Sequence, residues 1–167
     1  MMRKISDTST EIAMDVTKDT GFEETLLIRT AEKGDAGFII HSWLTSFREG
    51  DWVEGVPNQV YYHQHHKVVE SILSRATVLV LCLPDAPEVM FGWICVEACE
   101  NGIVLHYIYV KNEFRRSRLA SKLLNEVLEA EKPAVVFCTH RVRPMGFEFK
   151  KRGYLYNPYL LAKDMQR

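Results

Sequence analysis

The sequence has few of the features that mark membrane, fibrous or low-complexity proteins. Its longest uninterrupted apolar run covers residues 78–83, far short of the ~20 residues that span a bilayer. Only nine glycines and six prolines occur among 167 residues, which excludes collagen-like chains and proline-rich linkers. The remaining composition, 47% hydrophobic and 26% charged, is ordinary for a globular protein. We therefore expect one folded domain with no membrane-spanning segment.

The chain also lacks the cysteine spacing of a disulfide framework or a zinc site. Its four cysteines fall in apolar runs and form no C-x-x-C pair. The first residues contain no apolar core of the length that a secretory signal needs. His63, His65 and His66 are close in sequence, but they lack the i, i+4 spacing of helical zinc ligands. We expect reduced cysteines, a cytoplasmic protein and no metal site.

Charge is divided unevenly along the chain, although the net charge is only −1. Residues 1–103 carry 8 Lys and Arg against 16 Asp and Glu, a net charge of −8. Residues 104–167 carry 13 against 6, a net charge of +7. The basic part favours an anionic ligand, either a phosphorylated cofactor or nucleic acid, and the acidic part suits a cationic partner. A solvated surface alone would also explain this pattern.

Hydrophobic periodicity predicts a mixed α/β domain over residues 23–167. Residues 1–22 are polar and show no period, so we expect a loosely ordered N-terminal arm there. Apolar side chains recur at helical spacing in four segments, residues 35–47, 61–75, 117–130 and 144–152. Strand patterns cover residues 25–30, 76–83, 89–98, 103–110 and 134–139, with one or two further strands after residue 153.

The segment over residues 105–124 carries the strongest functional signal. An apolar strand pattern ends at Val110, and the most amphipathic helix of the chain begins among Arg115, Arg116 and Arg118. A helix N-terminus presents unpaired N–H groups and the positive end of the helix dipole. Because cations are slightly unfavourable at that end, three arginines there indicate an anionic ligand such as a pyrophosphate.

This segment resembles the cofactor motif of the GCN5-related N-acetyltransferase (GNAT) superfamily. In that motif a strand leads into a V-x-P-x-x-R turn, and R-x-x-G-x-G/A opens a helix. Val110 corresponds to the strand end, Asn112 to the usual proline, and Arg115 and Ala120 to the first and last residues of the helix motif. Residues 149–154 match a second family feature, an aromatic-x-x-x-Gly-aromatic run.

The resemblance implies a GNAT-like, mostly antiparallel central sheet of six to seven strands flanked by about four helices. It implies acetyl-CoA as the acetyl donor and a primary amine, on a small molecule or a protein, that attacks it directly in a ternary complex. It also implies a set of residues that contact acetyl-CoA: Ile108, Tyr109, Val110, Arg115, Arg116, Ser117, Arg118, Leu119, Ala120 and Ser121. In this architecture the loop between the first two helices lines the acceptor side, which here includes Asp51, Trp52 and Glu54.

Two residues depart from the family pattern. Arg118 replaces the internal glycine of the helix motif, so it either crowds the pyrophosphate or contacts it. Phe149 replaces the tyrosine that usually protonates the leaving thiolate. Tyr154, Tyr156 or a water molecule could serve instead, or the thiolate, with a thiol pKa around 8.5, could leave unassisted.

The reaction needs a neutral amine, and therefore a base that accepts its proton. Strict alternation along residues 103–110 would place Val104, His106 and Ile108 on one face of the strand. Family members that use a basic residue on this strand carry it on that face, so His106 is the candidate base. Glu97 on the preceding strand is the alternative.

Two other functions are consistent with these residues. The departures at Arg118 and Phe149 would suit a GNAT-like domain that binds a CoA ester or a protein without catalysis. The basic part of the chain would suit a GNAT-type enzyme that modifies nucleic acid, although the acidic part would repel a phosphate backbone. We expect no membrane partner, and a monomer or a homodimer.

Overall fold

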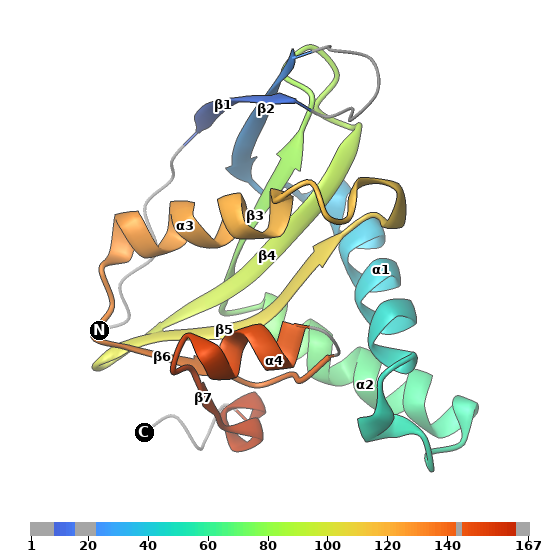
Figure 1. The fold of residues 1–167 in the computed structure, drawn as a ribbon. Coiled ribbons are helices and arrows are strands. Elements are labelled where there is room, and N and C mark those ends of the chain that lie inside the picture. Colours follow the sequence, from blue (N-terminus) through green and yellow to red (C-terminus); the bar gives the residue numbers. More distant parts are fainter. Residues whose placement is uncertain (1–8, 16–22, 143–144, 163–167) are drawn as a thin grey trace.

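A computed structural model of the chain describes residues 9–15, 23–142 and 145–162. Seven strands form one sheet in which neighbours in space are neighbours in sequence (Figure 1). They are β1 (Thr10–Asp15), β2 (Glu23–Thr30), β3 (Thr77–Cys82), β4 (Met90–Cys99), β5 (Gly102–Val110), β6 (Val135–Cys138) and β7 (Leu155–Tyr156). Strands β1 to β5 pair antiparallel, whereas β6 pairs parallel with both β5 and β7. The expectation of a mixed, mostly antiparallel sheet is confirmed.

Helices cover both faces of the sheet. In the described part of the chain the α-helices are α1 (Ala36–Arg48), α2 (Asn58–Leu73), α3 (Leu119–Glu131) and α4 (Met145–Lys151). Helices α1 and α2 lie behind the sheet in Figure 1, and α3 and α4 lie in front of it. Among the residues described, none of the helices has the length and apolar character needed to cross a bilayer.

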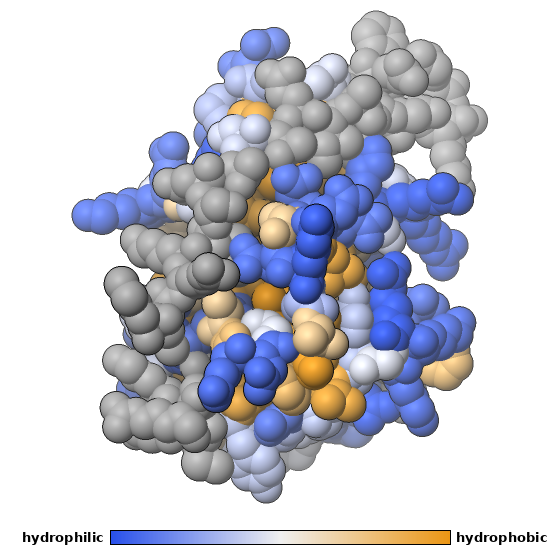
Figure 2. Space-filling model, turned by 90° about the vertical axis from the view of Figure 1, so that its left-hand side faces the viewer, coloured by the Kyte–Doolittle hydropathy of each residue, from blue (hydrophilic) through white to orange (hydrophobic). Residues whose placement is uncertain are grey.

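The sheet separates two hydrophobic cores. Behind it, α1 and α2 pack on aromatic residues of the sheet. The centroid of the Trp43 ring lies 5.3 Å from that of Trp93 and 5.1 Å from that of Tyr107. In front, Leu119 and Leu123 of α3 are buried against aliphatic residues of the strands. In the side view of Figure 2, hydrophilic side chains project from the surface and apolar atoms show in patches between them.

The N-terminal segment differs from the expected arm. Residues 10–15 form β1, which pairs with β2 from Thr10 opposite Ile28 to Asp15 opposite Glu23. Polar side chains do not prevent an edge strand, since its backbone hydrogen bonds come from the neighbouring strand. At the other end of the chain, β7 contains only two residues and is followed by a 3₁₀ turn at Pro158–Leu161.

Strand β5 contains a β-bulge at His106. Cys95 of β4 pairs with Tyr107 and the next residue, Val96, pairs with Leu105, so His106 is an extra residue in β5. The alternation of faces therefore changes across it: Leu105 belongs to the α3 core and Tyr107 to the α1–α2 core. Leu105 and Ile108, three residues apart, both lie on the α3 side, so strict alternation fails here and the predicted shared face of Val104, His106 and Ile108 is wrong.

Strands β5 and β6 separate at this bulge. Their pairing runs from Gly102 opposite Val135 to Leu105 opposite Cys138. The last backbone contact between them is the bond from Thr139 N to Leu105 O, at 3.3 Å. Within the described residues, no strand pairs with this edge of β5 over residues 106–110. The divergence leaves backbone groups of β5 facing a gap in the sheet.

Gly102 of β5 pairs with Val135 of β6, and the space beside it has no room for a side chain. A Cβ atom on Gly102 would lie 1.9 Å from the carbonyl oxygen of Val135, so the backbones would have to move apart. We expect Gly102→Ala to lower the free energy of unfolding by about 3 kcal/mol. In contrast, Gly37 lies in α1 with no atom within 4 Å of its Cβ position, and Gly37→Ala should raise stability by about 0.5–1 kcal/mol. Urea denaturation of both variants would contradict the prediction if Gly102→Ala were as stable as the wild type.

Candidate active site

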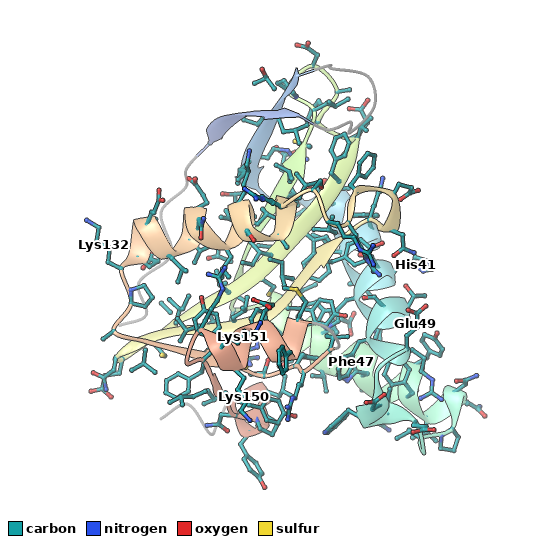
Figure 3. The ribbon with its side chains drawn as sticks, viewed as in Figure 1. His41, Phe47, Glu49, Lys132, Lys150 and Lys151 are labelled. Atoms are coloured by element: carbon teal, nitrogen blue, oxygen red, sulfur yellow. The ribbon has the colours of Figure 1, made fainter. Side chains whose placement is uncertain are left out.

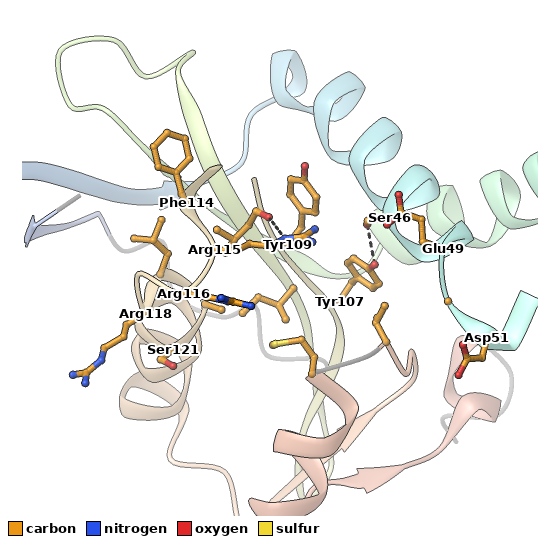
Figure 4. A pocket seen from close by; sticks show the side chains of 17 residues that line it. Ser46, Glu49, Asp51, Tyr107, Tyr109, Phe114, Arg115, Arg116, Arg118 and Ser121 are labelled. Atoms are coloured by element: carbon orange, nitrogen blue, oxygen red, sulfur yellow. Dashed lines mark hydrogen bonds between the residues drawn. The ribbon is translucent and has the colours of Figure 1, made fainter. Parts of the chain in front are cut away.

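A pocket of about 720 Å³ lies where β5 separates from β6. Its wall combines the exposed end of β5, the turn into α3, the end of α1 with the following turn, and the start of α4 (Figure 4). The lining residues are Ser46, Glu49, Gly50, Asp51, Tyr107, Ile108, Tyr109, Val110, Phe114, Arg115, Arg116, Arg118, Leu119, Ala120, Ser121, Val142 and Met145. Figure 4 shows the arginines near the start of α3 on one side and Glu49 and Asp51 on the other.

The start of α3 forms the basic side of the pocket. Arg118 is the N-cap residue, with φ 65° and ψ 13°, and Arg116 has φ 68°. Both values lie in the left-handed region, which costs a residue with a side chain about 1 kcal/mol. Arg118 thus adopts a conformation that glycine takes more readily than other residues, and its side chain extends away from the rest of the lining (Figure 4). The first-turn amides therefore face the pocket without being crowded by this arginine.

Arg115 connects the basic side to β5. Its Nε donates a hydrogen bond to the carbonyl oxygen of Val110, at 3.2 Å. Next to it, the Tyr107 hydroxyl lies 2.9 Å from the hydroxyl of Ser46 in α1. Burial raises the pKa of Tyr107 to about 12, although the Ser46 bond and the Arg115 charge act in the opposite direction. Tyr107 therefore stays protonated at neutral pH and can donate a hydrogen bond in this part of the pocket.

The opposite side of the pocket is acidic. Glu49 is the C-cap residue of α1 (Figure 3), and Asp51 follows it in the next turn. The last carbonyl groups of a helix carry its negative dipole end, which adds to the attraction of two carboxylates for a cation. Arg48 fixes the turn, because it donates to the carbonyl oxygens of Val53 at 2.5 Å and Val56 at 2.7 Å.

The donor groups of this pocket fit acetyl-CoA. Guanidinium groups and free helix amides are the donors that bind a pyrophosphate. Ile108, Val110 and Met145, which also line the pocket, provide apolar surface for an aliphatic arm. The unpaired edge of β5 provides backbone groups for an amide or a thioester carbonyl.

Comparison with known proteins identifies the fold but no close relative. No family model matches the sequence, and no curated protein matches it. A GNAT-family acetyltransferase from Staphylococcus aureus Mu50 superposes with a TM-score of 0.53 at 13% identity, covering 77% of this chain and 79% of that one. A GNAT-family acetyltransferase from Brucella melitensis in complex with acetyl-CoA gives 0.53 at 16% identity, over 77% and 81%. The chain has the GNAT fold.

A third solved structure supports the same assignment. The ribosomal-protein-alanine N-acetyltransferase from Brucella melitensis biovar Abortus 2308 superposes with a TM-score of 0.51 at 14% identity, covering 77% of this chain and 90% of that chain. At such identities the likeness establishes the GNAT fold alone. The resemblance drawn from residues 105–124 and 149–154 is therefore confirmed for the fold.

Most residues that the resemblance assigned to acetyl-CoA lie around the pocket of this GNAT fold. The exception is Ser117, whose hydroxyl donates to the carbonyl oxygen of Phe114. Those that line the pocket are Ile108, Tyr109, Val110, Arg115, Arg116, Arg118, Leu119, Ala120 and Ser121. Their contact with acetyl-CoA itself stays a prediction.

Only one of the three predicted acceptor residues lines the pocket. Asp51 does, whereas Trp52 and Glu54 are not part of the lining. The Trp52 side chain is 59% exposed and its ring lies 6.1 Å from that of Phe47. Successive residues of a turn point in different directions, so the acidic pattern of residues 49–54 indicated the segment but not which side chains face inward.

The predicted catalytic residues lie outside the pocket wall. His106 is only 1% exposed, and its ring contacts Glu97 at 2.9 Å and Thr139 at 3.0 Å. Neither His106 nor Glu97 lines the pocket, so their assignment as the base stays a prediction. Tyr154 packs in front of the sheet with its ring 5.5 Å from Phe149, and it does not line the pocket either.

Several pocket residues were missed by the sequence reasoning. Tyr107 is the most notable, because the bulge at His106 turns its ring to the pocket side, and alternation gives no sign of a bulge. Glu49 was visible as part of an acidic loop. The others, Ser46, Gly50, Phe114, Val142 and Met145, reach the pocket only through tertiary packing.

Three buried histidines predict a loss of stability in acid. Burial lowers the pKa of His65 to about 4, and burial also lowers the pKa values of His106 and His140. A depressed folded-state pKa gives stability that is complete above the unfolded value near 6.5 and is lost as the pH falls toward the folded value. His65 alone should therefore cost about 2 kcal/mol between pH 7 and pH 4.5.

Urea denaturation at the two pH values measures this loss. His65→Gln should flatten the dependence on pH, whereas His63→Gln should leave it unchanged because His63 is exposed. An identical pH dependence in wild type and His65→Gln would contradict the prediction.

Proposed function

We propose that this protein is an acetyl-CoA-dependent N-acetyltransferase whose acceptor is a cationic primary amine. One observation carries the proposal. A single pocket connects an arginine-lined helix N-terminus, an unpaired strand edge and an acidic turn. These three regions suit the pyrophosphate, the acetylated arm and the amine, in that order. Direct transfer in a ternary complex needs both substrates bound side by side, and a pocket of this shape allows it.

The cysteines give no support to a covalent acetyl-enzyme. Burial raises the pKa of the thiols of Cys82, Cys95 and Cys138, which disfavours the nucleophilic thiolate. None of the four cysteines lines the pocket. Direct attack by the amine is therefore the simpler route.

The amine must reach the pocket, lose a proton and attack the thioester. Glu49 and Asp51 would attract it as an ammonium ion, and deprotonation at pH 7 costs roughly 4.6 kcal/mol for a group of pKa ~10.4. His106 and Glu97 stay the candidates for the base, and their position requires that the proton reach them through other groups. Phe149 is buried and has no proton to donate, so we propose the pocket hydroxyl of Tyr107 as the donor to the departing thiolate.

Two measurements test this function. Calorimetry with CoA and acetyl-CoA should show saturable binding of both. Incubation with acetyl-CoA and a panel of amines, followed by mass spectrometry, should show acetylation of cationic primary amines. The panel should include a diamine, an aminoglycoside, a lysine peptide and a peptide with a free N-terminus. No binding of either CoA species would contradict the proposal.

One feature favours a second candidate, a domain that binds a CoA ester without catalysis. The usual proton donor is absent at Phe149, and Tyr154 does not line the pocket. The same two measurements separate the candidates, because saturable CoA binding without transfer to any amine would support the second.

A further inference from the structure

Six buried polar side chains form one continuous hydrogen-bonded chain beneath the point where β5 and β6 separate. They come from α2 and the residues after it, from β4, from the β5 bulge and from the end of β6. In order, they are Arg75, Glu97, His106, Thr139, His140 and His65. The successive contacts measure 3.0, 2.9, 3.0, 3.0 and 3.1 Å.

The proton positions along this chain follow from its carboxylate end. Arg75 can only donate, and its Nε contacts both oxygens of Glu97, so that carboxylate is an acceptor. His106 Nε2 must then donate to Glu97 Oε2. A neutral imidazole has one donor and one acceptor, and so His106 Nδ1 accepts from the Thr139 hydroxyl.

The rest of the chain is determined in the same way. With its proton directed at His106, the Thr139 oxygen accepts from His140 Nδ1. His140 Nε2 is then an acceptor, and His65 Nε2 donates to it. Each of the five contacts then joins one donor to one acceptor, and all of the donors point toward Glu97. Burial, which lowers the pKa values of all three histidines, favours this neutral state.

The chain crosses the divergence of the two strands. His106 is the extra residue of β5, and Thr139 is the first residue after β6. The hydrogen bond between their side chains therefore joins the two strands at the point where their backbone pairing ends. Tyr107, which follows the bulge and lines the pocket, packs edge-on against the ring of His140 with 5.6 Å between ring centroids.

We propose that this chain is a positioning network, in which the link from His106 through Thr139 to His140 sets how far β5 and β6 separate. By holding the bulge, it places the unpaired β5 edge and Tyr107 in the pocket. None of its six members lines the pocket, and in this role they act on it through the position of β5 and Tyr107. The effect on turnover rests on the proposed acetyltransferase function, whereas the geometry does not.

The test removes the central hydroxyl without changing the size of the side chain. Thr139→Val leaves His106 Nδ1 and His140 Nδ1 without their shared partner, and Thr139→Ser keeps the hydroxyl. We expect Thr139→Val to lower kcat at least ~tenfold while the Kd for CoA changes by less than about threefold. Thr139→Ser should stay within about threefold of wild-type kcat.

A second control separates positioning from loss of stability. Val136→Ala removes buried volume from β6 in the α3 core, and Val136 is not a member of the network. At a temperature where both variants are folded, it should keep wild-type kcat. Wild-type kcat in Thr139→Val, or an equal loss of kcat in Val136→Ala, would overturn the proposal.

Nuclear magnetic resonance tests the network independently of any activity. The imidazole nitrogen signals should identify the Nε2–H form of His106 and His65 and the Nδ1–H form of His140 at neutral pH. In Thr139→Val, backbone amide signals should shift along residues 106–110 as well as near position 139. Shifts confined to residues 138–141, or other histidine tautomers in the wild type, would overturn the proposal. If wild type transfers acetyl to no amine, the proposed function fails, and these signals still decide the network.

Discussion

The Arg115→Glu variant is expected to bind CoA at least about tenfold more weakly than the wild-type protein. Arg115 lines the pocket at the start of α3 and its Nε holds the Val110 carbonyl at 3.2 Å. The substitution replaces a cation with an anion beside the helix N-terminus, where a pyrophosphate would lie. It also removes the bond that fixes the turn against the end of β5. Both changes act against the same ligand.

Calorimetric titration with CoA measures the effect, and Lys150→Glu is a suitable control. Lys150 is an exposed residue of α4 (Figure 3) that does not line the pocket, and its replacement makes the same change in net charge. The control should bind CoA within about twofold of wild type, since an exposed charge outside the pocket is screened by salt. Equal affinities for Arg115→Glu and wild type would remove the pyrophosphate from this helix terminus.

The double variant Glu49→Gln/Asp51→Asn is expected to raise the KM for a cationic amine about tenfold. Both carboxylates line the acidic side of the pocket, at the C-terminal end of α1. Replacing them with amides of the same shape removes their attraction for an ammonium ion and leaves the pocket open. The KM for acetyl-CoA should change little, because its proposed phosphate site is on the opposite side (Figure 4).

Glu54→Gln provides the matched control for this variant. Glu54 belongs to the same acidic loop and is exposed, but it does not line the pocket. It should leave the KM for the amine unchanged, and the difference between the variants should shrink as salt is raised. An increase in KM in Glu54→Gln as large as in the double variant would show that the general charge of the loop, and not the pocket, attracts the amine.

The sequence predicted the central elements because their hydrophobic periods are regular. The pattern at residues 117–130 matches α3, whose Leu119, Leu123 and Val127 are buried at helical spacing. The acetyl-CoA candidates were accessible for a related reason. They all lie within residues 108–121, on one strand, turn and helix, so local sequence contains most of the information about that side of the pocket.

The rest of the site depends on packing between distant segments. Val142, which comes after β6, and Met145, which begins α4, reach the pocket because both lie where β5 and β6 separate. No local sequence pattern marks either residue. The strand at residues 10–15 was missed because an edge strand needs a partner and not an apolar face. Ser117 was included in the acetyl-CoA set, but its hydroxyl bonds to the preceding turn. The two side-chain partners of His106, Glu97 and Thr139, also come from separate segments of the chain.

The bulge at His106 affects how β5 can be aligned with other proteins. If the alternation of faces over Gly102–Leu105 is continued past His106 as in a regular strand, every later residue of β5 is assigned to the wrong face of the sheet. A correct alignment to a chain without the extra residue needs a one-position gap at His106. When Tyr107 and Tyr109 are compared with residues of other proteins of the GNAT fold, the alignment should therefore start at the turn before α3 and run backward along β5, and not start at the β4–β5 hairpin.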